Sequence, residues 1–193
     1  MSIFDTFLNY RVFVETLPLI LSGLATTLTL GVVCILVGFF VGIGLAMLRL
    51  YGPSPVRFVT VAYIDVFRSI PVLVLLFVVY YALPFAGIRF SSFTAASTSI
   101  SMISAAYSAE IIRAGIAAIP KGHIEAGVSL AMTRLEVLRY IVLRQAFAKI
   151  YPALSSQIVI VMLGSAVVSQ ISAPDLTYAA NFIQSRNFRA FEV

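Results

Sequence analysis

Two acidic residues are each followed, three positions later, by an arginine. Asp65 precedes Arg68, and Glu110 precedes Arg113. This spacing places the two members of each pair on one face of a helix. Both pairs fall at a similar depth inside apolar segments, where charges are costly and face a bundle interior or an aqueous cavity. We expect the four side chains to form one charge network along a translocation path, with a local ion pair that joins two helices as the open alternative.

The residue patterns of common enzymes are missing from the sequence. It contains no GxxxxGK[ST] phosphate loop, no HExxH and no GxSxG. Cys34 is the only cysteine, so the chain can form neither an internal disulfide nor a Cys/His metal cluster. His123 is the only histidine, and we expect it to make a surface contact rather than to catalyse. We therefore expect no enzyme, no ATPase site in this chain, and no cofactor or metal.

The composition is that of an integral membrane protein. Of the 193 residues, 61% are hydrophobic and 11% are charged, whereas soluble domains carry about 25% charged residues. The mean hydropathy is +1.03. The net charge of +5 is explained by cytoplasmic loops, which are enriched in Lys and Arg, so it does not indicate nucleic-acid binding.

The elements that must position these residues are membrane-spanning helices. Four intervals carry no charge, and each is long enough to cross a bilayer, which takes about 20 apolar residues. We expect an all-α bundle of four transmembrane helices, with Pro71 kinking the second. The predicted spans are 17–48, 58–84, 92–118 and 150–172.

Orientation and packing follow from the same sequence. Six Lys or Arg residues lie between Arg113, near the end of the third span, and Lys149, which places the loop after this span in the cytoplasm and puts the N-terminus and residues 173–193 outside. The third span is rich in Ser, Thr and Ala, which is typical of a helix buried among others. Gly38 and Gly42 form a small-xxx-small pair, which favours packing within the chain over a dimer interface.

The cytoplasmic loop has the pattern of two short helices. Pro120 and Gly122 end the third span, and apolar residues then recur at helical spacing at Ile124, Val128 and Leu135. Thr133 and Glu136 fit a capping box, which predicts a second helix from about residue 134. A helix–break–helix unit of this kind suits docking of a partner protein, and an interfacial helix resting on lipid headgroups is the alternative.

These segments resemble the inner-membrane permease subunit of ATP-binding-cassette importers, in the branch for polar amino acids. The family has a cytoplasmic Glu-Ala-Ala loop, which Glu125 and Ala126 match. Three positions depart from the family's loop pattern: Gly127 for the second Ala, Ala131 for a Gly, and Arg144 for a Pro. The similar segments cover nearly the whole chain: SGLATTLTL (22–30), VFRSIP (66–71), AYSAEIIRAGIAAIPKG (106–122), and DLTYAANFIQSRNFRAFEV (175–193), with Ile141 and Leu143 at the loop's ending.

The departures lead to two structural expectations. Ala131 disfavours a left-handed backbone, so the turn between the loop helices should be altered. Arg144 removes a helix breaker, so the second loop helix should run on. The family also has a fifth membrane helix, so we expect residues 1–193 to form one permease domain that lacks this last helix, with the coupling loop at 119–149.

The resemblance implies a transport subunit of the bacterial inner membrane that imports amino acids or related derivatives such as opines. It implies a second permease subunit, an external substrate-binding protein, and separate ATPase subunits that bind the ATP. Residues 122–132 would contact the ATPase, with Glu125 central. The expected docking residues are Gly122, His123, Glu125, Ala126, Gly127 and Ala131.

The substrate-binding residues are less defined. Arg68 could hold a carboxylate, and Ser165, Ser169 or Asp175 could reach an amino group, although each also suits a packing role. A secondary transporter driven by an ion gradient is the alternative function, since Asp65 and Glu110 would suit proton coupling. The ordered loop and the lack of inverted repeats argue against it.

Overall fold

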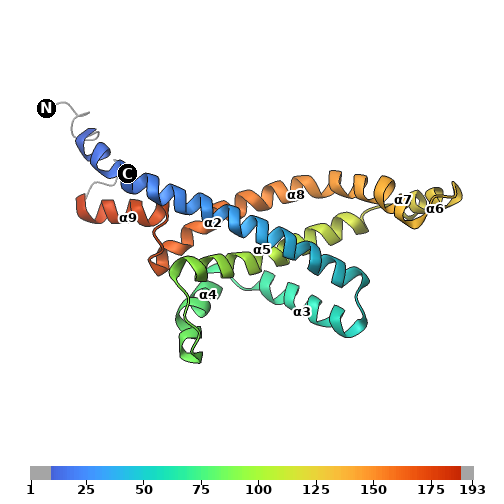
Figure 1. Ribbon diagram of the computed structural model, residues 1–193, viewed down its shortest axis with the longest axis horizontal. Coiled ribbons are helices and arrows are strands. Elements are labelled where there is room, and N and C mark those ends of the chain that lie inside the picture. The colour runs from blue at the N-terminus through green and yellow to red at the C-terminus, as the bar shows by residue number, and fades with distance from the viewer. Residues whose placement is uncertain (1–9, 188–193) are drawn as a thin grey trace. The chain divides into compact units, whose positions relative to one another are not determined.

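The computed structural model describes residues 10–187, and within this range the structure is helical without any strand (Figure 1). The sequence-based placements of the N-terminus and of the last residues lie outside the described range. The elements are α2 (Tyr10–Tyr51), α3 (Ser54–Ser69), α4 (Val72–Phe77), the π-helix η1 (Val78–Ala82), the 3-10 helix η2 (Leu83–Ala86), α5 (Ser92–Ala117), α6 (Lys121–Ser129), α7 (Arg134–Glu136), the π-helix η3 (Val137–Val142), α8 (Leu143–Gly164), the 3-10 helix η4 (Ser165–Ile171) and α9 (Leu176–Asn187).

Two helices of the described chain are long and apolar enough to cross a membrane alone, namely Val14–Tyr51 and Arg134–Ile171. Two further spans arise if each bent pair of helices counts as one, α3 with Val72–Ala86 and α5 with α6. The all-helical membrane fold is confirmed, and four spans are reached on this count. The last predicted span, 150–172, lies in a helix that runs without a gap from Arg134 to Ile171.

The predicted span 58–84 is wrong as one helix. Ile70 has an extended backbone, with φ −85° and ψ 127°, so α3 ends at Ser69 and a new helix begins at Val72. The cause is Pro71, because a proline ring pushes the preceding residue out of the helical region. The expected kink at this proline is therefore a complete break.

The chain packs as two compact units. One comprises Met1–Val33, Val72–Ile100 and Met162–Val193, and the other comprises Cys34–Pro71 and Ser101–Val161. The helices α2, α5 and α8–η4 each continue from one unit into the other. The second unit holds both acid–arginine pairs and the whole loop at 119–149, so its packing positions the candidate site.

The core of the second unit forms where α2 and α3 pack on α5 and the loop helices return against them. Its centre is Ala46, Ile64, Ala109, Ile112 and Ala146. Tyr63 fixes α3 to α5, since its hydroxyl donates to the Met102 carbonyl at 3.0 Å. Most of α5 from residue 99 to 112 is buried, which confirms the prediction from its Ser- and Ala-rich sequence.

The two predicted small residues of α2 provide a close helix contact within the chain. A side chain on Gly38 would collide with Ser104, and one on Gly42 would lie 2.6 Å from the Ser108 Cβ. Both contacts are with α5. The prediction that this glycine pair serves internal packing is therefore confirmed.

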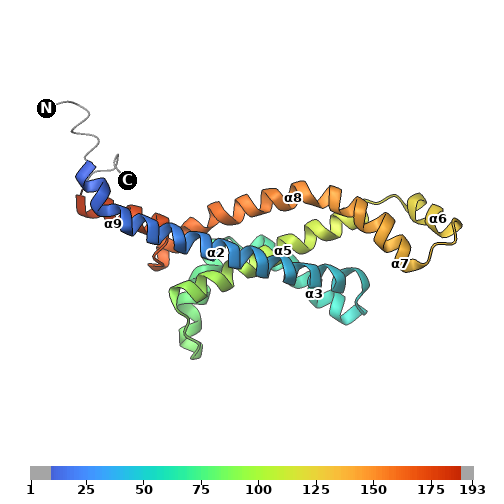
Figure 2. The ribbon, with the colours of Figure 1, turned by 45° about the horizontal axis from the view of Figure 1, so that its top comes forward.

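The first unit places α9 beside the N-terminal half of α2, as both views show (Figures 1 and 2). The backbone N–H of Leu176 donates to Thr27 Oγ1 at 3.0 Å. A side chain on Gly23 would lie 2.8 Å from the Asp175 carbonyl oxygen. The bond to Thr27 therefore holds the start of α9 against α2, and the absence of a side chain at Gly23 permits their close approach.

The contact at Gly42 gives a stability test. Gly42→Leu is expected to lower the free energy of unfolding by at least about 2 kcal/mol, because the new side chain has no space against α5. Gly44→Leu is the matched control, since nothing lies within 4 Å of its added Cβ. Thermal unfolding in detergent micelles measures both, and equal midpoints for the two variants would contradict this packing.

Candidate functional site

The loop at 119–149 presents α6 as an exposed helix. Pro120 separates α5 from α6, and the two helices meet at a bend of 57°. Figures 1 and 2 show α6 beyond the ends of α5 and α8. Every residue of α6 is exposed except Gly127. The predicted apolar stripe is shorter than expected, because α6 ends at Ser129 and Leu135 belongs to the next helix.

A left-handed residue closes α6. The N–H of Met132 donates to the Gly127 carbonyl at 3.1 Å, and the N–H of Ala131 donates to the Val128 carbonyl at 3.0 Å. These two bonds define a Schellman motif, whose residue after the C-cap is usually glycine. Here that residue is Ala131, with φ 57°. The expectation that alanine would alter this turn is wrong, since the left-handed turn is kept at the cost of strain.

The second loop helix begins at the predicted capping box. The N–H of Glu136 donates to Thr133 Oγ1, and the Thr133 N–H donates to the Glu136 carboxylate at 2.8 Å. From Arg134 the helix continues through η3 into α8 without a break at Arg144. Both predictions, the start near residue 134 and the continuation past Arg144, are confirmed.

Three contacts join α6 and the end of α5 to the returning helix. His123 Nδ1 donates to Gln145 Oε1 at 2.8 Å, because an amide oxygen can only accept. A side chain on Gly127 would lie 2.6 Å from Ile141 Cδ1, so its absence permits this close approach. Lys149 Nζ donates to the Ala118 carbonyl at 2.6 Å just beyond α5. Both α6 and the end of α5 are therefore joined to the returning helix.

Glu110 is the centre of the charge cluster. One of its oxygens accepts from Arg49 at 2.7 Å, and the other accepts from Arg113 at 2.6 Å. Arg113 Nε adds a second bond at 3.0 Å. The side chains of the three residues are 20–30% exposed. The carboxylate thus links the end of α2 to α5, and Arg49 is a partner that the spacing argument missed.

The other predicted pair lies apart from this cluster. Asp65 and Arg68 are exposed on α3, and neither takes part in the ion pairs of the described residues, which are those of Glu110. The Arg68 guanidinium lies over the Tyr107 ring, 5.4 Å from its centroid. The structure therefore brings Glu110 and Arg113 together but gives Asp65 and Arg68 no direct bond to them.

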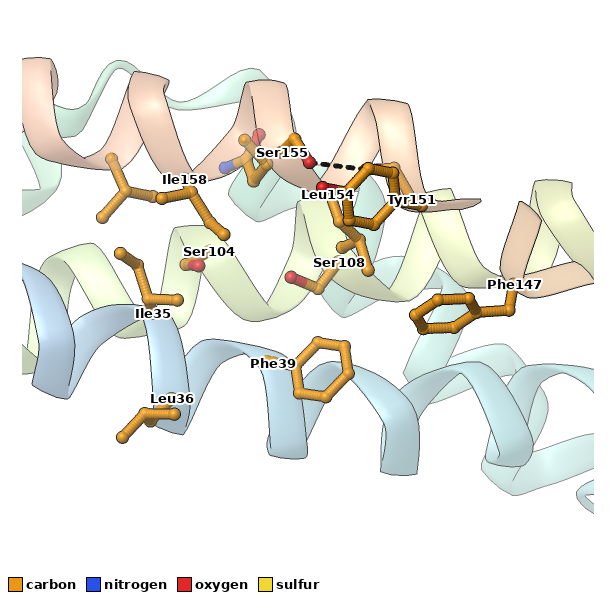
Figure 3. Close-up of a pocket in the computed structure, with 12 residues that line it drawn as sticks. Ile35, Leu36, Phe39, Ser104, Ser108, Phe147, Tyr151, Leu154, Ser155 and Ile158 are labelled. Atoms are coloured by element: carbon orange, nitrogen blue, oxygen red, sulfur yellow. Dashed lines mark hydrogen bonds between the residues drawn. The ribbon is translucent and has the colours of Figure 1, made fainter. Parts of the chain in front are cut away.

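A separate cavity of about 260 Å³ opens between α2, α5 and α8 (Figure 3). Its walls are largely hydrocarbon, with Phe147 at one end, Ile35 and Ile158 at the other, and Phe39 between them. The Ser155 hydroxyl in this wall donates to the Tyr151 carbonyl at 2.9 Å. The lining contains no charged side chain, so the cavity suits hydrocarbon better than a charged solute.

Three predicted residues of the first unit have structural contacts, and two of them, Ser165 and Asp175, are buried. The Ser165 hydroxyl donates to the Met162 carbonyl at 2.7 Å, and Ser169 bonds to Ala166 in the same way. Asp175 is 1% exposed and its Oδ1 accepts from the Tyr178 N–H, so it caps α9. Its Oδ2 has no partner among the described residues. Burial raises the pKa of the Asp175 carboxyl above its ordinary value.

The sequence matches one protein family over residues 35–190. That family is the binding-protein-dependent transport system inner membrane component. The chain belongs to this family. It is a multi-pass permease, a transport component of the ATP-binding-cassette type.

Named relatives and solved structures agree with this membership. The permease is 36% identical to the arginine transport system permease protein ArtQ of Bacillus subtilis (strain 168), over 88% of this chain and 78% of the relative. It is 34% identical to the glutamine transport system permease protein GlnP of Escherichia coli (strain K12), over 92% of this chain and 82% of the relative. A crystal structure of an amino acid ABC transporter with histidines superposes with a TM-score of 0.86 at 39% identity, covering 93% of this chain and 84% of that chain.

Sequence reasoning missed several partners of the permease's site residues. Arg49, Tyr107 and Gln145 each contact a predicted residue from a different helix. An arginine at a helix end opposite a partly buried glutamate is a usable signal only once the helices are paired.

The strained turn after α6 gives a second test. Ala131→Gly is expected to stabilise the loop by about 1 kcal/mol, because glycine adopts the left-handed conformation without a steric cost. Ala126→Gly, within α6, is the control and should destabilise it by about 1 kcal/mol. Hydrogen exchange of the Met132 and Ala131 amides measures both. Slower exchange in the control than in Ala131→Gly would exclude strain at this position.

The buried carboxyl of Asp175 gives a pH-dependent test. A raised folded-state pKa means that stability is present below the ordinary pKa of the carboxyl and is lost as the pH rises through the folded value. Asp175→Asn keeps the capping oxygen and carries no charge, so it should match the wild type in acid and exceed its unfolding midpoint at neutral pH. Asp175→Ala, which loses the cap, should be less stable at every pH. Parallel wild-type and Asp175→Asn curves would contradict the burial effect.

Proposed function

We propose that this permease imports amino acids or close derivatives such as opines across the bacterial inner membrane, driven by ATP that separate subunits bind. The observation that carries the proposal is the exposed apolar surface of the cytoplasmic loop. Val128, Leu130 and Leu135 are 61%, 77% and 71% exposed on and beside α6. Large apolar side chains that are exposed outside the membrane spans favour a protein partner.

The docking residues that we propose lie on this surface. Glu125 and Ala126 are exposed on α6, next to Gly122 and His123, while Gly127 and Ala131 shape the helix end. ATP-driven closure of the partner ATPase would move α6, and the ties to α8 and α5 would carry this movement into the spans. The external substrate-binding protein and a second permease subunit would shift the same equilibrium between states.

The contacts of the loop support mechanical coupling. A partner can shift an equilibrium only if the element it holds is tightly joined to the moving part. His123 with Gln145 joins α6 to α8, and Lys149 joins α8 to the end of α5. Glu110 then joins α5 to the end of α2 through Arg49. The loop is thus joined to three spans.

The alternative of an ion-gradient-driven transporter is less favoured. Both carboxylate oxygens of Glu110 already accept from arginines. A carboxyl that exchanges protons during transport needs an oxygen that is free to take one, and arginine N–H groups already occupy both oxygens of Glu110. Asp65 is the other acidic residue of the predicted charge network, and it forms no ion pair among the described residues.

Uptake into proteoliposomes tests the proposed function. The chain reconstituted with its ATPase subunits and binding protein should take up an amino acid only when ATP is supplied on the side of the ATPase. The double variant Glu125→Lys, Ala126→Asp should reduce ATPase co-purification and uptake by at least about 10-fold. It reverses the charge at residue 125 and adds a charge at residue 126, and binding of the ATPase would bury both. Arg89→Glu, on the predicted opposite side of the membrane, is the control.

Two results would contradict the proposal. Uptake that follows a pH gradient and ignores ATP would establish the ion-driven alternative. ATPase co-purification that survives the double variant, with Arg89→Glu equally unaffected, would remove α6 from the interface.

A further inference from the structure

The cavity of Figure 3 extends along one face of α8. Phe147, Tyr151, Ser155 and Ile158 line it at intervals of four, four and three residues, which places them on one side of the helix. Three of them are exposed, and so is Leu36 across the cavity on α2, so the cavity is open to the surroundings of the helices. An apolar cavity of about 150 Å³ already holds a benzene molecule. At about 260 Å³, this cavity has room for a run of methylene groups.

The cavity lies at the depth of a single lipid leaflet. From Ile150 to Ile171 the helix carries no charge, and this stretch is about 33 Å long, close to the hydrocarbon thickness of about 30 Å. Counted from Ile150, the last lining residue, Val161, lies about 17 Å deep, close to the roughly 15 Å of one leaflet. The hydrocarbon next to the cavity therefore consists of the acyl chains of the leaflet beside the loop at 119–149.

Two arginines extend the cavity face of this helix toward the loop. Arg144 precedes Phe147 by three residues, so it lies on the same side of the helix. It comes six residues before Ile150, or about 9 Å, which places it beside the lipid headgroups. The Arg139 guanidinium lies 5.6 Å from the centroid of the Tyr140 ring, and Tyr140 precedes Arg144 by four residues. Both positive charges therefore lie near the Phe147 end of the cavity.

Neither arginine has an acidic partner among the residues that the structure describes. Both are exposed, and the ion pairs found there are those of Glu110. Glu136 is the nearest acidic residue along the helix, and its carboxylate accepts from the N–H and the hydroxyl of Thr133, each at 2.8 Å. Guanidinium groups pair with phosphate in a bidentate geometry. Two guanidiniums at headgroup level, beside a cavity for hydrocarbon, match the two chemical parts of a phospholipid.

We propose that this site binds one anionic phospholipid of the leaflet beside the loop at 119–149. One acyl chain fills the cavity between α2, α5 and α8. The phosphate accepts hydrogen bonds from the Arg144 guanidinium, and Arg139, held beside it by Tyr140, adds a second positive charge. The inference goes beyond the proposed function, because it concerns neither the substrate nor the ATPase and needs only a membrane-spanning permease.

The arginines, rather than the cavity, determine which lipid binds. An acyl chain that enters the cavity leaves one hydrocarbon environment for another, so the hydrophobic effect contributes little. One arginine near the membrane surface favours an anionic lipid by about 5-fold. Two arginines therefore favour it by about 25-fold over a zwitterionic lipid. The family pattern has a proline at position 144, so the charge there is a feature of this chain.

Photolabelling with lipids tests the site. The transporter complex is placed in nanodiscs of phosphatidylcholine that contain a small fraction of labelled lipid. The label is a diazirine halfway along one acyl chain of either phosphatidylglycerol or phosphatidylcholine, and mass spectrometry of peptides locates the adducts. Phosphatidylglycerol should label residues 35–39 of α2 and 154–158 of α8 at least about 5-fold more than phosphatidylcholine does.

Variants separate the headgroup contact from the cavity. Arg144→Gln should lower phosphatidylglycerol labelling by about 5-fold, whereas Arg57→Gln, at an exposed residue of α3, should leave it unchanged. Ser155→Phe fills the cavity and should abolish labelling of these residues by both lipids. Ser156→Phe is its matched control, because Ser156 is exposed outside the lining and its hydroxyl bonds to its own helix, as that of Ser155 does.

Three kinds of result would overturn the inference. Equal labelling by the two lipids in the wild type would remove the headgroup contact. Unchanged labelling in Ser155→Phe, or adducts as frequent on the exposed Phe40 and Val159 as in the cavity, would show that the cavity does not hold the chain. Loss of ATPase co-purification in Arg144→Gln, with unchanged phosphatidylglycerol labelling, would assign the arginines to a protein interface. Unfolding midpoints are measured alongside, and if Ser155→Phe does not fold, the adduct positions in the wild type and in Arg144→Gln decide.

Discussion

The carboxylate of Glu110 is the interaction on which the arrangement of the second unit most depends. It accepts from Arg49 at the end of α2 and from Arg113 one turn along α5. Two cations around one anion leave a net positive cluster. The side chains are partly exposed, so solvent weakens each pair, but removing the glutamate would leave two arginines facing each other. This bond fixes the end of α2 against α5, and the Gly38 and Gly42 contacts continue the same interface.

The helical class, the capping box and the loop helix could be predicted from local patterns. Thr133 and Glu136 are three residues apart, and Gly38 and Gly42 share one helix face, so neighbouring sequence contains the whole signal. The sequence predicted only a kink at Pro71, because the apolar pattern continues through this residue, whereas the helix ends at Ser69. Arg49 and Glu110 are 61 positions apart. Rules based on local spacing do not apply over that distance, so their bond could be identified only from the packing of the helices.

The loop shows how three departures from a family pattern can be accommodated together. Gly127 stands where the family has alanine, and the missing side chain lets Ile141 approach the helix. Ala131 stands where the family has glycine, yet the Schellman bonds to Gly127 and Val128 hold it in the left-handed region. Arg144 replaces a proline, and the helix from Arg134 runs on. The prediction of an altered turn considered only the backbone strain of alanine at position 131. It left out the hydrogen bonds of the Schellman motif, which offset this strain.

The two acid–arginine pairs have the same spacing but opposite environments, and this difference assigns them different roles. Glu110 forms ion pairs with Arg113 and with Arg49, so its charge serves to hold helices together. Asp65 and Arg68 lie at a helix end where a proline stops the backbone bonding and Tyr107 attracts the guanidinium. Asp65 and Arg68 are exposed, so solvent can serve each charge separately, whereas the partly buried Glu110 needs the cations on α2 and α5. The closed pair therefore holds two helices together, and the open pair leaves Arg68 over the Tyr107 ring.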